Sequence, residues 1–378
     1  MFAKYSQGTI PRQGQTRWPE QLIEEHHGRD GFAGDCTVLH REHPTTKWTR
    51  VTGPLRPRGL QTTGLTVADA DDPRALPTVL LFNDDVSVAV SRRRTPAPYY
   101  LRNLDGDTII LVLLGSGRMV SDFGSLPYGP REYLVIPKGT NYRLIPDDVE
   151  HLAYFIETTE PVEVADRTML GHFLPFDTAV LEVPVLDGPS GTPAEQDGEW
   201  EVVLKRDGEL TSIFYDFDPL DVVGWQGNVV PFRLKLSDIR PLTAERLDVP
   251  PVTHATFQTP GAWVCTFAPR PWQSADDAAR VQPFHRNVDY DEVIIHLGGD
   301  EGVPGPPPGL LTVTPGGMNH GPSAALVATP LARLPFYILN LDTRRALRVT
   351  SDFESAEIPD FAGKVAYGAA PPPGPKGH

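Results

Sequence analysis

The sequence is poor in cysteine and has no long apolar run. Among 378 residues only Cys36 and Cys265 are cysteines, too few for a disulfide framework or a thiolate metal site. This scarcity is typical of a reducing compartment. No basic and apolar leader opens the chain, and no apolar run approaches the ~18 residues needed to span a bilayer. We therefore expect a cytoplasmic protein without membrane contact.

Basic residues are also scarce relative to acidic ones. The chain has 34 Lys and Arg against 49 Asp and Glu, for a net charge of -15 and a pI of about 5.1. Such a surface repels phosphate backbones and anionic lipids, so we expect no nucleic-acid partner. The hydrophobic fraction of 40% is ample for sizeable cores, and the length predicts two domains.

Proline and glycine, in contrast, are abundant and indicate the fold class. The 40 prolines and 34 glycines interrupt the chain too often for many long helices. Short β-rich runs lie between them, for example TVLLF at 78–82, TIILVLL at 108–114 and EVIIHL at 292–297. We predict an all-β-dominated fold of two β-sandwich or jelly-roll barrels with few short helices, the helices near 19–27 and 274–280.

Composition also predicts the domain boundaries. Residues 187–198, DGPSGTPAEQDG, have linker composition. We assign residues 1–186 to an N-terminal arm and barrel, and residues 199–368 to a second barrel. Residues 369–378 are predicted to form a disordered tail.

The two halves share an internal repeat. The phrase PYYLRNLDGDTIILVLLGSG, which starts at Pro98, matches PFHRNVDYDEVIIHLGG at 283–299. The first copy continues to YLVIPKGTNY at 133–142 and the second to LTVTPGGMNH at 311–320. Two matched phrases in the same order indicate a duplicated domain.

The second copy contains residues that could bind a metal. Its polar, glycine and proline positions resemble the two cupin motifs, with Asn287 where the second His of the first motif usually stands. The matching residues are His285, Asn287, Glu292, Gly299, Gly309, Pro315, Gly317 and His320. Alternate residues of a barrel strand face inward, and the Pro-x-Gly turn aims the last His at the same point.

Three of these residues are the predicted metal ligands. His285, Glu292 and His320 offer two imidazoles and one carboxylate, a set that leaves open metal positions suited to non-haem Fe(II) oxygen chemistry. The first copy has no corresponding ligands, so we expect its barrel to be metal-free. The residues at the three ligand positions of the first copy are Leu101, Thr108 and Tyr142.

Longer phrases resemble one family within the cupins. The chain is similar to homogentisate 1,2-dioxygenase and its shorter bacterial relatives, which are bicupins. The phrases are GRDGFAGDCTVLHREHPTTKW at 28–48, PLDVVGWQGN at 219–228, THATF at 253–257, FHRNVDYDEV at 284–293 and HGP at 320–322. The resemblance implies an Fe(II)-dependent, ring-cleaving dioxygenase of aromatic catabolism that acts on a hydroxylated aromatic acid and O2. It also implies that His254 acts as acid/base near the substrate.

The candidate substrate-contacting residues depart from this family. Thr314 stands six residues before the last ligand, where the family has a further His, and the region before His285 is shortened. We therefore expect a dihydroxylated or amino-hydroxylated aromatic acid, with homogentisate a poor substrate. His296 either lines the pocket or is a packed or exposed His. Arg270 is a candidate for binding a substrate carboxylate.

Other interpretations stay open at this point. Asn287 is a further candidate pocket residue, and the N-terminal histidines His26, His27, His40 and His43 are expected to make local or intersubunit contacts. We also expect a homo-oligomer. Alternative functions are a non-oxidative metal-dependent cupin isomerase or decarboxylase, and a metal-poor bicupin binding protein. Oxygen uptake separates the first alternative from a dioxygenase, and metal content separates the second.

Overall fold

The computed structural model consists mainly of β-strands. It describes residues 5–16, 22–30, 34–147, 150–165, 170–186, 199–279, 283–299, 305–328 and 332–369. In this part of the chain the strands form five sheets, and the α-helices are short: α1 (Ala324–Ala328), α2 (Ser351–Ala356) and α3 (Phe361–Lys364). The predicted all-β fold class is confirmed. No helix among the described residues is long and apolar enough to cross a membrane.

The first barrel consists of two facing sheets. The larger sheet has the strand order β16 (Phe232–Lys235), β10 (Glu132–Ile136), β7 (Asp107–Leu114), β12 (Leu152–Thr158), β5 (Val86–Ser91), β4 (Thr78–Phe82) and β25 (Arg348–Val349). The other sheet has the order β15 (Glu209–Tyr215), β14 (Trp200–Arg206), β6 (Tyr100–Asn103), β11 (Asn141–Pro146), β8 (Gly117–Ser121) and β9 (Gly124–Tyr128).

The second barrel has the same plan. Its larger sheet has the order β13 (Glu163–Val164), β17 (Ala255–Thr259), β18 (Ala262–Phe267), β24 (Phe336–Thr343), β21 (Asp291–Gly299), β22 (Leu310–Thr314) and β3 (Arg58–Gln61). A smaller sheet has the order β2 (Cys36–Arg41), β1 (Ile23–Gly28) and β20 (Phe284–Asn287). The strands β19 (Arg270–Pro271) and β23 (Arg333–Leu334) pair separately.

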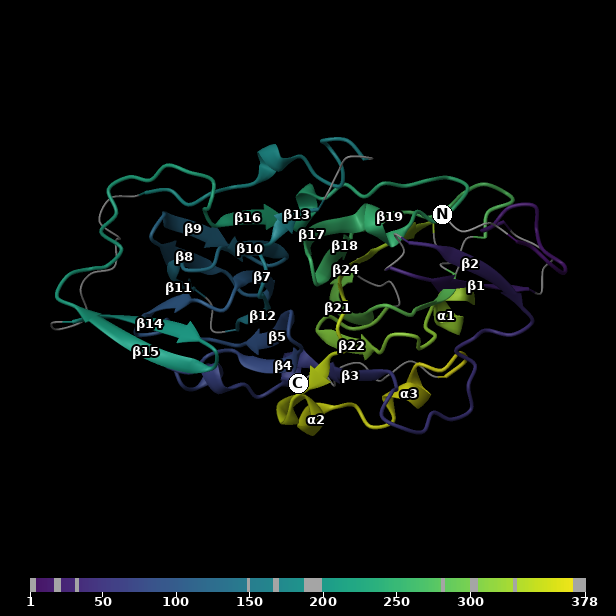
Figure 1. Ribbon diagram of the computed structural model, residues 1–378, viewed down its shortest axis with the longest axis horizontal. Coiled ribbons are helices and arrows are strands. Elements are labelled where there is room, and N and C mark those ends of the chain that lie inside the picture. The colour runs from purple at the N-terminus through teal and green to yellow at the C-terminus, as the bar shows by residue number, and fades with distance from the viewer. Residues whose placement is uncertain are drawn as a thin grey trace.

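The two halves of the chain exchange their first strands. Strand β1 pairs in parallel with β20 of the second barrel, and β14 pairs in parallel with β6 of the first. Likewise β3 joins β22, whereas β16 joins β10. Figure 1 shows the hairpin β1–β2 at one end of the molecule and β14–β15 at the other. The strands β1, β2 and β3 of the first half therefore complete the barrel of the second half.

Several sequence predictions bear on this arrangement. The predicted linker at 187–198 and residues 370–378 of the predicted tail lie outside the described residues. The helix predicted over 19–27 is wrong where the structure describes it, because Ile23–Gly28 is a strand held between β2 and β20. The second predicted helix is also wrong: residues 274–279 form a turn that ends in a bridge between Ala278 and Thr16.

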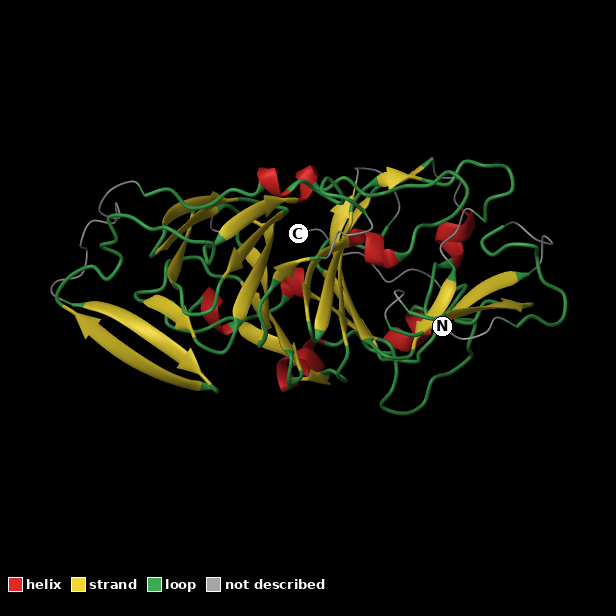
Figure 2. Ribbon diagram, turned by 45° about the horizontal axis from the view of Figure 1, so that its top comes forward, coloured by secondary structure: helices red, strands yellow, loops and turns green. Residues whose placement is uncertain are grey.

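The larger sheets of the two barrels share one hydrophobic core. Fully buried Ile109 and Tyr154 of the first barrel belong to the same cluster as Phe257 and Ile295 of the second. Figure 2 shows these strands side by side in the middle of the molecule. Because strand residues alternate, the inward contact of Val293 and Ile295 with this core turns Glu292 to the opposite face of β21, into the second barrel.

Candidate metal centre

Three potential metal ligands converge inside the second barrel. His285 lies on β20, Glu292 on β21, and His320 in the segment that follows β22. One ligand atom of each lies within 4.8 Å of the others. In the described part of the chain no other group of His, Cys, Asp and Glu side chains gathers in this way.

The Pro-x-Gly turn aligns His320 with β20. Gly317 has a φ of 81°, a left-handed conformation that favours glycine. Its N–H donates to the carbonyl of Asn287 at 2.8 Å. Beyond the turn, His285 and His320 exchange both main-chain hydrogen bonds at 2.9 Å. These backbone contacts hold His285 and His320 side by side, so their imidazoles start from neighbouring positions.

The orientation of the imidazoles suits metal binding. The Nδ1 atom of His285 lies 3.0 Å from the carbonyl of Pro283, and that of His320 lies 3.1 Å from the carbonyl of Met318. A carbonyl partner favours the tautomer with Nδ1–H, which leaves the lone pair of Nε2 for a metal. The Nε2 atom of His320 is buried, makes no hydrogen bond, and lies 3.3 Å from Oε1 of Glu292.

The charge states also suit a cation. Burial would raise the pKa of Glu292, but the His320 and His285 imidazoles and a hydrogen bond with Asn340 lower it to about 2. Burial and the charge of His320 lower the pKa of His285 to about 3. Burial opposes protonation of His320, but the Glu292 carboxylate raises its pKa. A cation bound beside ionised Glu292 and neutral His285 would take the place of the His320 proton. The residues therefore fit a metal ion.

Several buried residues of the second barrel have unpaired polar atoms. Among the described residues, buried side-chain atoms without a hydrogen-bond partner include both ring nitrogens of His254, Nδ2 of Asn287, and the Oδ1 atoms of Asn340 and Asp342. Buried polar groups are normally hydrogen-bonded, and exceptions concentrate at functional sites. The inner face of the second barrel is therefore the candidate active site.

His254 lies at the edge of this face with its ring buried. It ends the short 3-10 helix η5 (Pro251–His254), is 1% exposed, and packs its ring 4.8 Å from that of Phe267. Burial, with a smaller contribution from the positive charge of Arg270, lowers its pKa to about 3. The imidazole is therefore neutral at pH 7 and can accept a proton.

Arg270 lies next to this histidine. The side chain is 5% exposed, and its guanidinium lies 5.6 Å from the centre of the Phe267 ring. Its acidic neighbour, Asp248, is 3.8 Å away, beyond hydrogen-bond distance. Such a guanidinium keeps donors for a further anion.

The other predicted pocket residues share the inner face. Thr314 is paired directly with Glu292 across β22 and β21, and both are nearly buried. His296 lies four residues beyond Glu292 on the same strand, and burial lowers its pKa to about 4. Asn287 lies on β20 two residues after the ligand His285 and is 5% exposed. The structure thus places Thr314, His296 and Asn287 in the ligand-bearing barrel.

Two further residues were missed by the sequence reasoning. Asn340 and Asp342 lie on β24, and Asp342 is paired directly with Glu292. Burial and the Glu292 charge raise the pKa of Asp342 well above its usual value. The signal was present, because LNLDT at 339–343 alternates polar residues with an apolar set in a central strand.

The exchanged hairpin also reaches the centre. His26 on β1 is paired with His285 in the parallel register, and its Nε2 lies 2.6 Å from Oε1 of Glu24. His27, in turn, accepts a hydrogen bond from Arg286 at 2.9 Å. The His26 contact is local, whereas the His27 contact joins the first half of the chain to the second.

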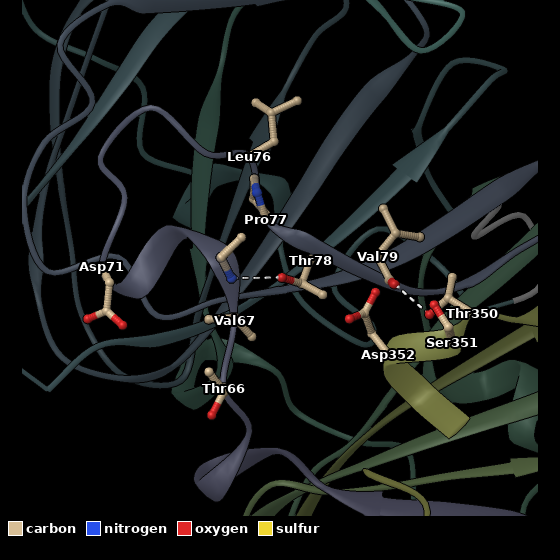
Figure 3. A pocket seen from close by; sticks show the side chains of 11 residues that line it. Thr66, Val67, Asp71, Leu76, Pro77, Thr78, Val79, Thr350, Ser351 and Asp352 are labelled. Carbon is tan, nitrogen blue, oxygen red and sulfur yellow. Dashed lines mark hydrogen bonds between the residues drawn. The ribbon is translucent and has the colours of Figure 1, made fainter. Parts of the chain in front are cut away.

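A separate surface hollow has different chemistry. It has a volume of about 660 Å³ and lies between the segments around Thr66, Pro77 and Thr350 (Figure 3). Its polar side chains include Asp71 and Asp352, and none of the candidate site residues lines it. It carries no histidine or basic group and is not a candidate for the reaction.

Comparison with known proteins finds similarity to dioxygenases. Residues 91–236 match the family described as Homogentisate 1,2-dioxygenase N-terminal. The chain is 27% identical over 387 residues to the dioxygenase-like protein SSO1533 of Saccharolobus solfataricus, covering 96% of this chain and 98% of the other. It is 28% identical over 194 residues to homogentisate 1,2-dioxygenase of Rhodopseudomonas palustris, covering 49% of this chain and 42% of that enzyme.

Solved structures match more weakly. Protein YlbA of E. coli covers 79% of this chain and 95% of its own at a TM-score of 0.35 and 11% identity. A cupin-2 domain protein of Shewanella frigidimarina covers 22% of this chain and 79% of its own at a TM-score of 0.20 and 19% identity. The family match at residues 91–236 and the partial match to the Rhodopseudomonas enzyme confirm a resemblance to the homogentisate 1,2-dioxygenase family, and the match to SSO1533 extends the similarity to dioxygenases over nearly the whole chain.

Proposed function

We propose that the protein is an Fe(II)-dependent dioxygenase that cleaves the ring of a hydroxylated aromatic acid. The convergence of His285, Glu292 and His320 within 4.8 Å is the observation that carries this proposal. Two imidazoles and one carboxylate, with open positions, suit non-haem Fe(II) better than a closed structural site. Iron bound there would supply adjacent positions for a phenolate oxygen and O2.

The protein residues around the ligands support this chemistry. Neutral His254 accepts the proton of the substrate hydroxyl and later returns it. The carbonyls of Pro283 and Met318 hold the Nδ1 protons of the ligand imidazoles. Arg270 supplies positive charge for the substrate carboxylate. The apolar ring of Phe267 contacts both Arg270 and His254.

The substrate differs from homogentisate in this proposal. Thr314, beside Glu292, offers a hydroxyl where the family has an imidazole. A buried polar group that loses its partner costs about 1–3 kcal/mol, enough to change preference by one to two orders of magnitude. We propose a dihydroxylated or amino-hydroxylated aromatic acid as substrate. Cytoplasmic location and homo-oligomeric assembly stay predictions.

Oxygen uptake after anaerobic Fe(II) reconstitution tests the proposal. The substrates to compare are homogentisate, gentisate, catechols and hydroxyanthranilates, and we expect uptake with at least one but little with homogentisate. Replacing any ligand by Ala should abolish uptake and most iron binding while the protein stays folded by circular dichroism. Absence of oxygen uptake with every phenol, despite bound metal, would favour the non-oxidative isomerase or decarboxylase.

The role of His254 is tested separately. His254→Gln should keep its iron but slow the reaction by about 10²–10⁴-fold, the usual loss for a general acid/base. Iron content is measured beside the rate. Loss of iron from this variant would show that His254 supports the metal instead.

A further inference from the structure

The duplication allows the two barrels to be compared residue by residue around the metal centre. In the first barrel Lys205 on β14 is paired with Asn103 on β6; in the second, Gly28 on β1 is paired with Asn287 on β20. Glycine thus stands in the second barrel where the first has a lysine.

The same register holds on the facing sheet. Glu157 on β12 is paired with Thr108, and Asp342 on β24 is paired with Glu292. Since Thr108 and Glu292 correspond in the repeat, Asp342 is the counterpart of Glu157.

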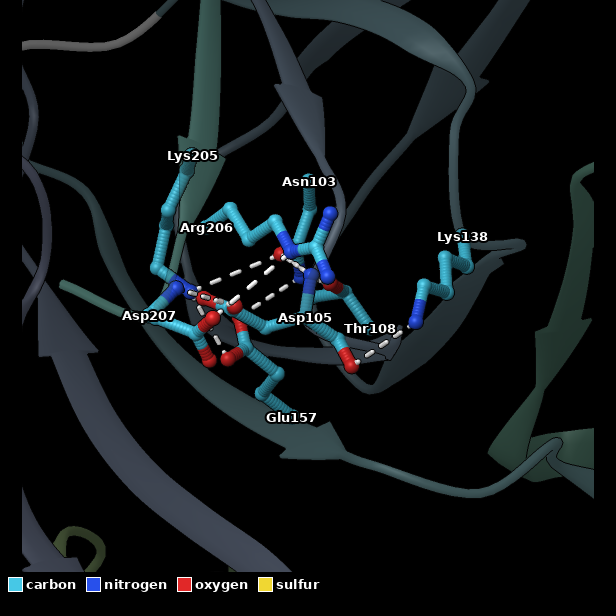
Figure 4. A network of polar contacts seen from close by, with 8 residues as sticks. All are labelled: Asn103, Asp105, Thr108, Lys138, Glu157, Lys205, Arg206 and Asp207. Atoms are coloured by element: carbon cyan, nitrogen blue, oxygen red, sulfur yellow. Dashed lines mark hydrogen bonds and ion pairs between the residues drawn. The ribbon is translucent and has the colours of Figure 1, made fainter. Parts of the chain in front are cut away.

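The lysine ammonium is a bound cation of the first barrel. Its Nζ lies 2.6 Å from Asp105 and 2.8 and 2.9 Å from the two carboxylate oxygens of Glu157 (Figure 4). It also lies 3.4 Å from Oδ1 of Asn103, whose Nδ2 donates to Glu157 at 2.6 Å. Four oxygen atoms from three side chains thus accept hydrogen bonds from the ammonium.

The second barrel keeps the acceptors but not the cation. Oδ1 of Asp342 has no hydrogen-bond partner, and Oδ1 of Asn287 accepts from the N–H of Asp289 at 3.4 Å, as Oδ1 of Asn103 accepts from Asp105 at 3.0 Å. Both residues are buried, at 3% and 5% exposure. Asp289, the counterpart of Asp105, is already engaged by the side chain of Arg29 at 2.7 Å and by the N–H of Asp30 at 2.8 Å. Asn287 and Asp342 are therefore the groups with capacity for a ligand.

Space is available where the lysine side chain begins. A Cβ atom added to Gly28 would meet no atom within 4 Å, and the residue has no left-handed φ. Glycine is thus not demanded by the backbone or by a close neighbour at this buried position. The room that Lys205 fills in one barrel is open in the other.

We propose that Asn287, Asp342 and the space beside Gly28 form a subsite for an amino or ammonium group of the substrate. The subsite adjoins the metal ligands, because Asn287 follows His285 by two residues and Asp342 is paired with Glu292. It rests on the proposed function and narrows its substrate to an amino-hydroxylated aromatic acid. A primary amine has two N–H donors, one for Oδ1 of Asp342 and one for Oδ1 of Asn287, the acceptors that correspond to those of Glu157 and Asn103 around the lysine ammonium.

Two ligands that differ in one group test this subsite. The probes are 2-amino-3-hydroxybenzoate and 2,3-dihydroxybenzoate, titrated anaerobically into Fe(II)-loaded protein at pH 7 in a calorimeter. We expect the amino compound to bind about 10-fold more tightly, because its amino group can donate two hydrogen bonds where the hydroxyl can donate one. Equal affinities, or tighter binding of the dihydroxy compound, would overturn the subsite and leave the iron proposal intact.

Variants separate the subsite from the metal centre. Gly28→Lys should place its own ammonium between Asn287 and Asp342, keep the iron, and abolish the preference for the amino compound. Asp342→Asn should reduce the preference about 10-fold. Gly224→Lys, at an exposed glycine with nothing within 4 Å, is the matched control and should retain it.

Metal content and thermal unfolding are measured for every variant. A folded, iron-loaded Gly28→Lys protein that keeps the preference would refute the subsite. Iron-loaded wild-type protein that binds neither compound would overturn both the subsite and the aromatic substrate.

Discussion

One buried carboxylate ties the exchanged hairpin to both histidine ligands, and its removal should weaken metal binding. Glu25 on β1 is 0% exposed. It accepts a hydrogen bond from Asn319 at 2.8 Å, forms an ion pair with Arg286 at 3.2 Å, and contacts Arg41. Asn319 precedes the ligand His320, whereas Arg286 follows the ligand His285. The same carboxylate therefore holds both ligand-bearing segments.

The size of the effect follows from these contacts. Glu25→Gln keeps an acceptor for Asn319 but loses the charge that faces two arginines. Breaking a buried ion pair costs ~3–5 kcal/mol; because Arg41 and Arg286 are 42% and 31% exposed, water offsets part of this, and we expect ~2–3 kcal/mol of unfolding free energy. Loss of groups behind metal ligands typically reduces metal affinity 10-fold to 100-fold, and we expect about 10-fold.

Urea unfolding and Fe(II) competition against a chelator measure the two effects. Glu201→Gln is the matched control: Glu201 is 8% exposed on the hairpin of the first barrel and binds Arg74 at 2.7 and 2.9 Å. It should lose stability without a change in metal affinity. The reasoning is refuted if Glu25→Gln unfolds more easily but binds Fe(II) as tightly as the wild type.

Three further predictions concern stability and specificity. Lys205→Met should lower the unfolding free energy by ~2–4 kcal/mol in urea, because Asp105 and Glu157 lose their cation. Burial opposes ionisation of Asp105, but Lys205 lowers the pKa of its carboxyl group. In the wild type the stabilisation from this ion pair is therefore present above pH 3.8 and lost as pH falls further. The variant should lack that acid dependence. His254 has a pKa of about 3 against 6.5 when unfolded. It should therefore contribute ~1.4 kcal/mol per pH unit to the loss of apo-protein stability as pH falls below 6.5, and His254→Gln should make that loss shallower by this amount. Thr314→His should raise oxygen uptake with homogentisate.

The candidate site was predictable because its determinants are local. Glu292 belongs to an alternating strand, and His320 follows a Pro-x-Gly turn whose backbone geometry is encoded by neighbouring residues. The internal repeat then supplied a comparison within one chain, since Tyr142 stands where His320 does. Short phrases of this kind specify which side chains face inward, independently of the rest of the fold.

The exchange of hairpins was not predicted, because the partner of an edge strand is decided by tertiary contacts. Periodicity at Ile23–Gly28 could not distinguish a strand from a helix, and the acidic first turn favoured the wrong choice. A signal nevertheless exists in GRDG at 28–31 and KRDG at 205–208. Asp30 and Asp207 both adopt positive φ, and both backbone N–H groups bind the corresponding aspartates. The repeat therefore includes the hairpins.

The two barrels differ in what surrounds a buried carboxyl group. Each has a carboxylate at the same position of the facing sheet, Glu157 in the first and Asp342 in the second. A buried carboxylate is costly without a positive partner. The first barrel meets this need with Lys205, delivered by the hairpin of the other half. In the second, Gly28 stands in the place of that lysine, and burial together with the Glu292 charge raises the pKa of Asp342 instead. Among the described residues the candidate metal ligands belong to the barrel of the second copy, and the exchanged hairpin leaves space open beside them at Gly28.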